Sequence, residues 1–261
     1  MPLPQLGDSA IYESQPEFLK KSINRQRYFW RWDTPEKYQT NMRAYFRMIS
    51  GIDHVAGRLV KQLESQGIAD NTIIIYTADN GYYLGDRGFA GKWTHYEQSL
   101  RVPLIIHDPR LPESKRGLVL KELAINSDLA STMIELAGLP TPKAHTGRSL
   151  APLLRGEDAS NWREDFLCEF LAVPGSIPRW EGVRHEDWVY ARYYVNGPNE
   201  PPHEFLHDLV NDPDQLTNLA LNMKESDELN QIRARCDKLI AEAGPAMKDV
   251  GEVQRKKRKK K

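Results

Sequence analysis

The hydrophobic positions in the first part of the chain repeat with the period of a helix. Between residues 33 and 67, apolar side chains recur every three or four positions, which is one face of an α-helix. Pro35 falls in the first turn, where a helix tolerates proline, and Gly67 supplies a natural end. The pattern predicts one long helix that buries a single stripe against a sheet. The stripe consists of Tyr38, Met42, Tyr45, Ile49, Ile52, Val55, Leu59 and Leu63.

Two continuous apolar runs follow this predicted helix, at residues 72–78 and 101–106. Runs rich in β-branched and aromatic residues are typical of strands that are buried on both faces of a parallel sheet. Residues 127–138 then return to helical spacing and end on Gly138. Strand, long connection, strand and helix together predict an α/β fold.

The hydrophobic pattern becomes shorter in the last third of the chain. Residues 139–162 are rich in proline, glycine and polar side chains and are predicted to be a linker. Short strand-like segments follow at 165–173, 187–195 and 204–210, and residues 226–244 have the spacing of an amphipathic helix. These elements predict a small α+β subdomain.

Composition and charge exclude several classes of protein. The 261 residues include 36 basic and 36 acidic side chains, and this balance argues against nucleic acid as the partner of the whole chain. Cys168 and Cys236 lie far apart and in no metal-ligand spacing, so neither a disulfide scaffold nor a structural zinc site is expected. Since no apolar run approaches ~20 residues, we expect no membrane span. The first residues lack the pattern of a secretory signal.

The first strand run ends on Asp79-Asn80-Gly81, and this tripeptide raises a question of chemistry. In open α/β sheets, ligands bind beyond the carboxyl ends of strands, where Asp79 and Asn80 are expected to lie. Their carboxylate and amide oxygens are hard ligands suited to calcium or magnesium. Taken alone, the three residues favour a simple turn, because Asp-Asn-Gly is among the commonest turn compositions. They leave a metal site and a turn as alternatives.

The residues that follow decide between these alternatives. YTADNGYYLGDRGFAGKWTHYEQSLRVPLII, residues 76–106, resembles a conserved block of the type I sulfatases, which belong to the alkaline-phosphatase superfamily. The block has a strand ending in S/T-x-D-N-G, then L-G-x-x-G, then G-K-W-x-x-Y-E-x-S-x-R-V-P-L-I, and each fixed element is present. The G-K-W-x-x-Y-E style is similar to glucosamine-6-sulfatase-like bacterial enzymes. The resemblance extends from Phe18 to Gly244.

The resemblance implies a fold and a domain order. It implies part of an alkaline-phosphatase-like sandwich, a mostly parallel sheet flanked by helices, followed by a small α+β C-terminal subdomain. Residues 1–158 would be the C-terminal part of the α/β catalytic domain, and residues 159–250 the subdomain. Residues 251–261 are expected to be a basic, disordered tail. Members of this family usually act in the periplasm, outside the cell or in lysosomes.

The resemblance also implies roles for individual residues. Asp79 and Asn80 are similar to two ligands of the active-site Ca²⁺, and Lys92 to the catalytic lysine that contacts the sulfate ester. An ordinary surface lysine is the alternative for Lys92. His95 lies three residues after Lys92 and is a weaker candidate, as a contact in the substrate pocket. The implied reaction is hydrolysis of sulfuric esters, with a sulfated carbohydrate as the substrate class.

Part of the family pattern is absent from this sequence. Type I sulfatases attack with a formylglycine made from Cys or Ser in C/S-x-P/A-x-R, and neither Cys168 nor Cys236 lies in that context. The segment Ser176–Arg179 comes closest, but its arginine is one residue too early. The family's Asp-Asp pair is also absent. We therefore expect the C-terminal half of a sulfatase, with unpaired strand edges, that cannot hydrolyse esters without an N-terminal half.

Two other functions stay open at this point. The chain could be a non-catalytic remnant that binds a glycan or a partner through the surviving half-site. It could also be a phosphodiesterase or phosphonate hydrolase of the same superfamily, although the amide of Asn80 suits a single hard cation better than zinc.

Overall fold

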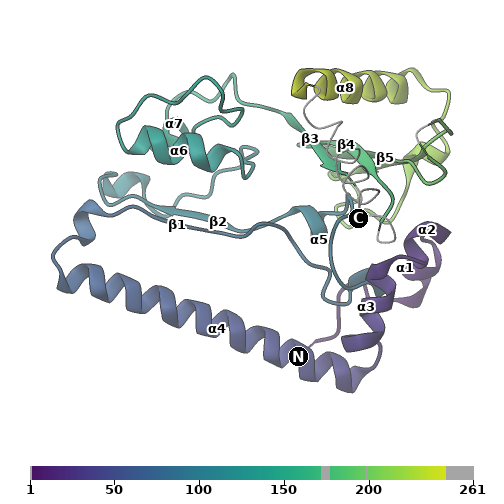
Figure 1. Ribbon diagram of the computed structural model, residues 1–261, viewed down its shortest axis with the longest axis horizontal. Coiled ribbons are helices and arrows are strands. Elements are labelled where there is room, and N and C mark those ends of the chain that lie inside the picture. The colour runs from purple at the N-terminus through teal and green to yellow at the C-terminus, as the bar shows by residue number, and fades with distance from the viewer. Residues whose placement is uncertain (1, 172–176, 198, 245–261) are drawn as a thin grey trace, which may run out of the picture. The chain divides into compact units, whose positions relative to one another are not determined.

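The computed structural model describes residues 2–171, 177–197 and 199–244 (Figure 1). Contacts divide the chain into two compact units, which we describe separately. Unit 1 comprises residues 1–45, 80–101 and 165–261, and unit 2 comprises residues 46–79 and 102–164. The predicted domain boundary at residue 158 stays a prediction. The predicted basic tail, residues 251–261, lies outside the described residues.

The N-terminal part of unit 1 is helical. It contains α1 (Ser9–Glu13), α2 (Glu17–Lys20), α3 (Ile23–Arg31) and the first turns of α4 (Pro35–Ser65). Asp8 caps α1, because its carboxylate accepts a hydrogen bond from the amide of Ala10 at 2.8 Å. Trp32 and Tyr38 pack together near the start of α4, with Ala90 in the same small cluster. No described helix is long and apolar enough to cross a membrane.

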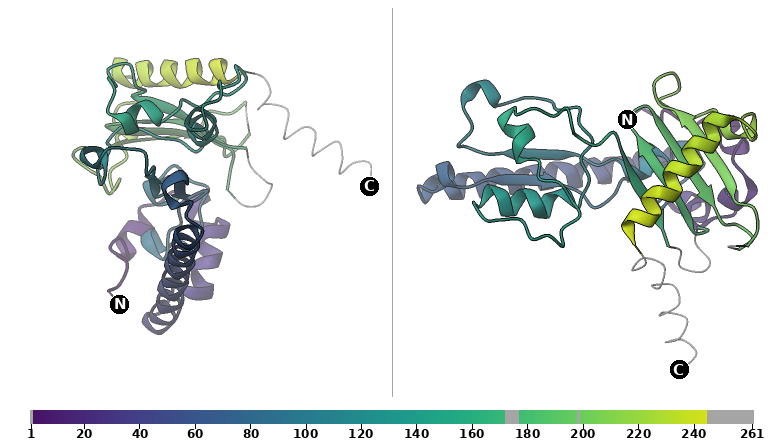
Figure 2. Two further views of the ribbon diagram at one scale, coloured as in Figure 1. Left: turned by 90° about the vertical axis from the view of Figure 1, so that its left-hand side faces the viewer. Right: turned by 90° about the horizontal axis from the view of Figure 1, so that it is seen from above.

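Unit 1 also contains a four-stranded antiparallel sheet in the order β3-β4-β5-β6. Its strands are β3 (Asp165–Phe170), β4 (Trp180–His185), β5 (Trp188–Tyr193) and β6 (His203–Asp208). Helix α8 (Asp227–Ala243) lies across one face of this sheet (Figure 2, right). The sheet and helix agree with the predicted α+β subdomain, although β4 was not among the predicted strands.

Each face of this sheet carries its own hydrophobic cluster. On the α8 side, the buried side chains include Val183, Tyr190, Leu206 and Leu229. The other cluster includes Trp180 and Tyr193 from the sheet together with Tyr83, Phe89 and Tyr96 from the loop after β1. The conserved-block segment 83–96 is therefore built into the core of unit 1. A short helix, α5 (Glu97–Leu100), ends this segment.

Unit 2 contains a two-stranded sheet, β1 (Ile74–Thr77) and β2 (Leu104–His107), with α6 (Asp128–Leu136), α7 (Ala151–Arg155) and the rest of α4. The two strands are antiparallel, with Thr77 opposite Leu104, so the prediction of a parallel pair is wrong for them. The chain leaves β1 and enters β2 at the same end, which forces opposite directions. No parallel strand pair occurs among the described residues.

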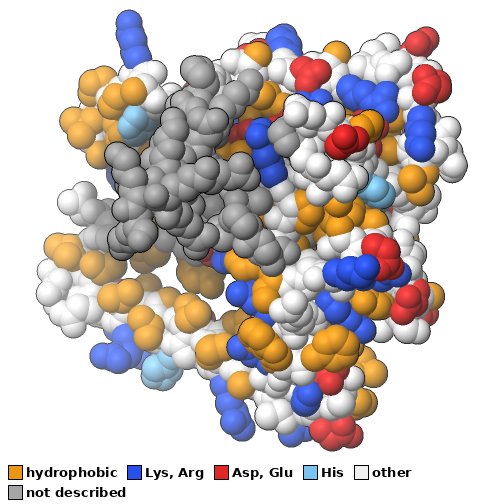
Figure 3. All heavy atoms as spheres, turned by 45° about the vertical axis from the view of Figure 1, so that its right-hand side comes forward, with side chains coloured by type: hydrophobic (Ala, Val, Ile, Leu, Met, Phe, Trp, Pro, Cys, Tyr) orange, Lys and Arg blue, Asp and Glu red, His pale blue; other side chains and the backbone are white. Residues whose placement is uncertain are grey.

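The strands and the long helix of unit 2 are less buried than their sequences predict. Tyr76 of β1 is 42% exposed, which contradicts the predicted burial of that strand on both faces, and Ile105 of β2 is 61% exposed. Every residue of α4 from Phe46 to Gln62 is exposed. Figure 3 shows hydrophobic side chains (orange) on the surface of this helix at lower left. The predicted buried stripe is therefore wrong from Ile49 to Leu59, where each of its side chains is exposed, while Leu63 is half-buried.

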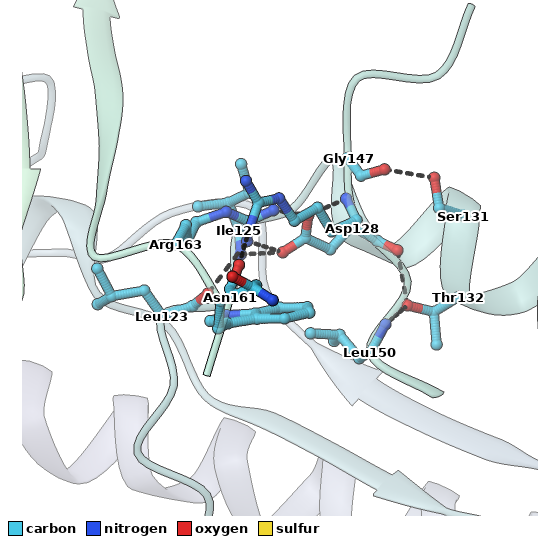
Figure 4. Close-up of polar contacts among 11 residues, drawn as sticks. Leu123, Ile125, Asp128, Ser131, Thr132, Gly147, Leu150, Asn161 and Arg163 are labelled. Atoms are coloured by element: carbon cyan, nitrogen blue, oxygen red, sulfur yellow. Dashed lines mark hydrogen bonds and ion pairs between the residues drawn. The ribbon is translucent and has the colours of Figure 1, made fainter. Parts of the chain in front are cut away.

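A buried polar network joins α6 to the following loop (Figure 4). The Asp128 carboxylate is fully buried and accepts hydrogen bonds from the amides of Ile125 at 2.9 Å and Arg148 at 2.8 Å. The Arg163 guanidinium pairs with both carboxylate oxygens, with Nη2 at 2.7 Å from Oδ1. Residues 139–162 are not the predicted linker. They contain helix α7, and the amide of Arg148 within them donates to the buried Asp128 carboxylate.

Candidate active site

The structure brings two of the predicted site residues together in unit 1. The Lys92 ammonium donates a hydrogen bond to the Oδ1 atom of Asn80, although the residues are twelve positions apart. The Nδ2 atom of Asn80 donates to the carbonyl of Gly81 at 2.8 Å, which orients the amide so that its oxygen faces the lysine. The result is an ammonium fixed beside an amide oxygen.

Gly81 holds Asn80 close to helix α5. Its amide donates to the carbonyl of Ser99 at 2.9 Å. A Cβ atom on Gly81 would collide with the carbonyl oxygen of Gln98 and lie 2.9 Å from that of Arg101. The third residue of the Asp-Asn-Gly motif is therefore glycine because two backbone segments approach closely here, and not because of a positive φ.

Asp79 lies at the edge of unit 2 and is exposed. Its backbone carbonyl accepts a hydrogen bond from the side-chain amide of Asn126 at 3.0 Å. The boundary between the two units falls between Asp79 and Asn80. Their use as common ligands of one metal ion therefore stays a prediction.

His95 is fully buried, and both of its ring nitrogens are engaged. Its Nδ1 atom lies 2.9 Å from the Tyr193 hydroxyl, and its Nε2 atom lies 3.1 Å from Nε2 of His207. Nδ1 of His207 lies 2.8 Å from the carbonyl of Thr217. A carbonyl can only accept, so His207 donates to it, His95 donates to His207, and Tyr193 donates to His95. His95 is therefore not among the groups that we propose to touch substrate.

Burial keeps these two histidines neutral. Loss of hydration lowers the pKa of His95 well below its usual value and lowers the pKa of His207 to about 4. The nearby Arg87 guanidinium lowers both pKa values further. The pair ties the segment that carries Lys92 to strands β5 and β6.

Two arginines that the sequence analysis did not single out as important help to fix the same segment. Arg87 is fully buried and donates to the backbone carbonyls of Asp214 and Gln215, while its guanidinium lies 4.0 Å from the centre of the Tyr96 ring. Arg184 pairs with Glu97, with Nε at 2.8 Å from Oε1. Arg87 occupies a variable position of the L-G-x-x-G element and Arg184 lies outside both elements, so of these residues only Glu97, the partner of Arg184, is a fixed member of the motif.

The donor chemistry of Asp79 and Asn80 suits a hard cation, but only as part of a larger ligand set. An amide oxygen has two lone pairs, so Asn80 can accept from Lys92 and still bind a metal ion. Among the described residues, no group of three or more His, Cys, Asp or Glu side chains could hold a metal. Burial raises the pKa of the Cys168 and Cys236 thiols to about 12, so neither is a thiolate.

Two family profiles match the chain over more than half of its length. One is described as "N-sulphoglucosamine sulphohydrolase, C-terminal" and matches residues 85–242. The other is described as "Sulfatase" and matches residues 7–139. The chain belongs to the sulfatase family. This confirms the family resemblance seen in the sequence.

Individual sulfatases agree with this assignment. The chain is 32% identical over 221 residues to an N-acetylglucosamine-6-O-sulfatase of Bacteroides thetaiotaomicron, covering 82% of the chain and 38% of that relative. A solved protein in complex with its substrate D-glucosamine-2-N,6-O-disulfate superposes with a TM-score of 0.70 at 30% identity, over 77% of the chain and 40% of that structure.

A crystal structure of a putative sulfatase from Bacteroides thetaiotaomicron gives a TM-score of 0.80 at 25% identity. This superposition covers 96% of the chain and 54% of that structure. The chain therefore has the fold of part of a sulfatase and spans 38% of the curated relative's length.

Proposed function

We propose that this chain supplies one half of a sulfuric ester hydrolase site that acts on sulfated glycans. The observation that carries the proposal is the hydrogen bond between the Lys92 ammonium and Asn80, within the segment that matches the sulfatase family. A fixed ammonium beside an oxygen ligand is an arrangement that can hold an anionic ester next to a cation.

Lys92 has the role of binding the sulfuryl oxygens. Its charge is held in place before substrate arrives, so it stabilises the negative charge that develops there without reorganisation. Asp79 and Asn80 would be two ligands of a Ca²⁺ ion. When bound, that ion would polarise the same oxygens as a Lewis acid.

This chain matches only part of each relative. We propose that the nucleophile and the other metal ligands come from a polypeptide that corresponds to the remaining part. A formylglycine is the nucleophile expected in this family. Cys236 is buried and Cys168 is half-buried, and burial raises the pKa of both thiols, so neither suits that role. We further propose that β1 and β2 join a mostly parallel sheet when that part is present, within a catalytic domain that ends near residue 158.

A sulfated amino sugar is the substrate class that the relatives favour. One of them is named an N-acetylglucosamine-6-O-sulfatase, and a solved relative has a disulfated glucosamine as its substrate. These properties belong to those proteins and support the same class of substrate for the completed site here.

The test is complementation. The chain is combined with the part of the Bacteroides thetaiotaomicron relative that the chain does not match, and that part is first matured so that it contains formylglycine. Sulfate release from 6-O-sulfated N-acetylglucosamine is then measured in the presence of Ca²⁺. We expect turnover, and we expect Lys92→Ala to lower kcat by about 100- to 1000-fold. Lys238→Ala, which changes an exposed lysine on α8, is the matched control and should leave kcat unchanged.

Three results would contradict the proposal. The first is a stable complex in which Lys92→Ala turns over as fast as the unchanged chain. The second is preferential hydrolysis of an aryl phosphonate ester, which would indicate a phosphonate hydrolase. The third is binding of the sulfated sugar without release of sulfate, which would indicate a non-catalytic binding protein.

A further inference from the structure

The backbone on either side of Lys92 adopts an unusual conformation. Gly91 has a φ of 116° and Trp93 has a φ of 78°. Glycine adopts positive φ at little cost, but a bulky residue such as tryptophan does so at a cost of about 1–3 kcal/mol. Such a conformation persists only where the surrounding structure holds it, so the groups that hold this turn are of interest.

One buried residue of helix α3 holds the turn on both sides of Gly91. The backbone carbonyl of Asn24 accepts a hydrogen bond from the amide of Ala90 at 2.9 Å. The side-chain Nδ2 atom of Asn24 donates to the carbonyl of Lys92 at 2.9 Å. Asn24 is only 1% exposed. A Cβ atom on Gly91 would collide with Oδ1 of Asn24, so the close approach itself requires glycine.

Hydrogen bonds from a residue of the sheet and from a residue of the same loop also hold the turn. The indole Nε1 of Trp180, at the start of β4, donates to the carbonyl of Trp93 at 2.8 Å. The amide of Tyr83 donates to the carbonyl of Gly91 at 3.0 Å. Arg27, one helical turn after Asn24, places its guanidinium 4.8 Å from the centre of the Trp93 ring. The carbonyls of three successive residues, 91–93, are therefore all engaged.

We infer that Asn24 is a positioning residue that sets the direction of the Lys92 side chain toward Asn80. This inference rests on the function proposed for Lys92. A lysine side chain has four rotatable bonds, so its ammonium is placed well only when its backbone is fixed. Asn24 bonds to the backbone carbonyl of Lys92, whereas the side-chain ammonium of Lys92 is the group that we propose to bind substrate. It therefore acts through Lys92.

The first test observes the Lys92 ammonium directly in the unmodified full chain by ¹⁵N NMR, with Lys92→Arg used to assign the signal. The hydrogen bond to Asn80 should slow exchange of the ammonium protons with water. In Asn24→Ala we expect this exchange to be at least about 10-fold faster, while the amide protons of β4 and β5 keep their protection. Asn41→Ala is the control, because the side chain of Asn41, like that of Asn24, donates to backbone carbonyls, in this case those of Arg31 and Lys37 at exposed positions.

A second pair of variants keeps the test decisive if Asn24→Ala unfolds, which loss of protection in β4 and β5 would reveal. Trp180→Phe removes the indole N–H but keeps an aromatic ring, and Trp162→Phe is its control. Trp162 donates to the carbonyl of Leu123 at 2.9 Å in unit 2. We expect faster exchange of the Lys92 ammonium in Trp180→Phe and no change in Trp162→Phe.

The inference is overturned if the Lys92 ammonium exchanges at the unchanged rate in a folded Asn24→Ala or, where that variant unfolds, in Trp180→Phe. This readout needs no turnover, so it is independent of whether the complemented protein releases sulfate. In an active complemented protein, Asn24→Ala should also lower kcat/KM by about 10- to 100-fold. An unchanged kcat/KM there would equally contradict the inference.

Discussion

The two units of this chain differ in what holds them together. Unit 1 contains all three hydrophobic clusters of the described residues, and its loop 83–96 is part of one of them. Unit 2 leaves many of its large apolar side chains exposed, from Ile49 and Leu59 on α4 to Met133 on α6. Its fully buried carboxylate, Asp128, forms a polar network with Arg148 and Arg163. A hydrophobic period in a sequence therefore shows that a face needs covering, but not which chain covers it.

The largest loss of stability is expected in unit 2, on breaking its polar network. Asp128→Ala leaves the Arg163 guanidinium, whose side chain is 9% exposed, without its carboxylate, and this should cost about 3–5 kcal/mol. Urea unfolding followed by fluorescence reports on this network, because Trp162 donates to Leu123 beside it.

Asp165→Ala is the control for this variant in unit 1. Asp165 forms a two-bond pair with Arg235, at 2.6 and 2.7 Å, but the Arg235 side chain is 36% exposed. Its loss should cost only about 1 kcal/mol. Equal losses for Asp128→Ala and Asp165→Ala would show that unit 2 does not depend on its buried pair.

A second comparison uses one leucine from each unit. Leu229 is fully buried against the sheet of unit 1, and Leu229→Ala should cost about 2–5 kcal/mol in the free energy of unfolding. Leu59 is 61% exposed, and Leu59→Ala should change that free energy by no more than about 0.5 kcal/mol. Chemical denaturation of both variants measures the difference. A large loss for Leu59→Ala at low protein concentration would mean that α4 is covered in solution.

The smallest expected effect is the pH dependence of unit 1. The folded pKa of His207 is about 4, below the value of about 6.5 for an unfolded chain, so between these values the unfolded state binds more protons. Stability should therefore fall as pH falls from about 6.5 to about 4, by at most about 1.4 kcal/mol per pH unit for this histidine. Urea midpoints at pH 7 and pH 5 test this, and His207→Gln should flatten the dependence. A midpoint that does not change with pH would contradict it.

The sequence predicts local elements better than it predicts their partners. The period of apolar residues gives α4 and α8 nearly to their ends, and the β-branched runs give β1 and β2. The hydrophobic pattern does not predict strand direction, because a run of apolar residues is the same in a parallel and an antiparallel pair. The proline- and glycine-rich stretch 139–162 was wrongly predicted to be a linker, because composition does not reveal buried hydrogen bonds such as those to Asp128.

The sequence predicted some residues of the candidate site and missed others. A motif of fixed spacing gives Asn80 and Lys92, which the structure brings into contact. His95 was a candidate only because it follows Lys92 by three residues, and its partners Tyr193 and His207 lie about a hundred residues away and turn the ring into the core. Asn24 was missed, because one asparagine on a short helix carries no local signal of the turn that it holds.

Hydrogen exchange of the full chain, measured by mass spectrometry, tests the difference between the units most directly. We expect the amides of β4 and β5 to exchange at least about 100-fold more slowly than those of residues 46–62 and of β1 and β2. Adding the complementing polypeptide should slow exchange in unit 2 and leave β4 and β5 unchanged. Equal protection of both units in the chain alone would contradict the account.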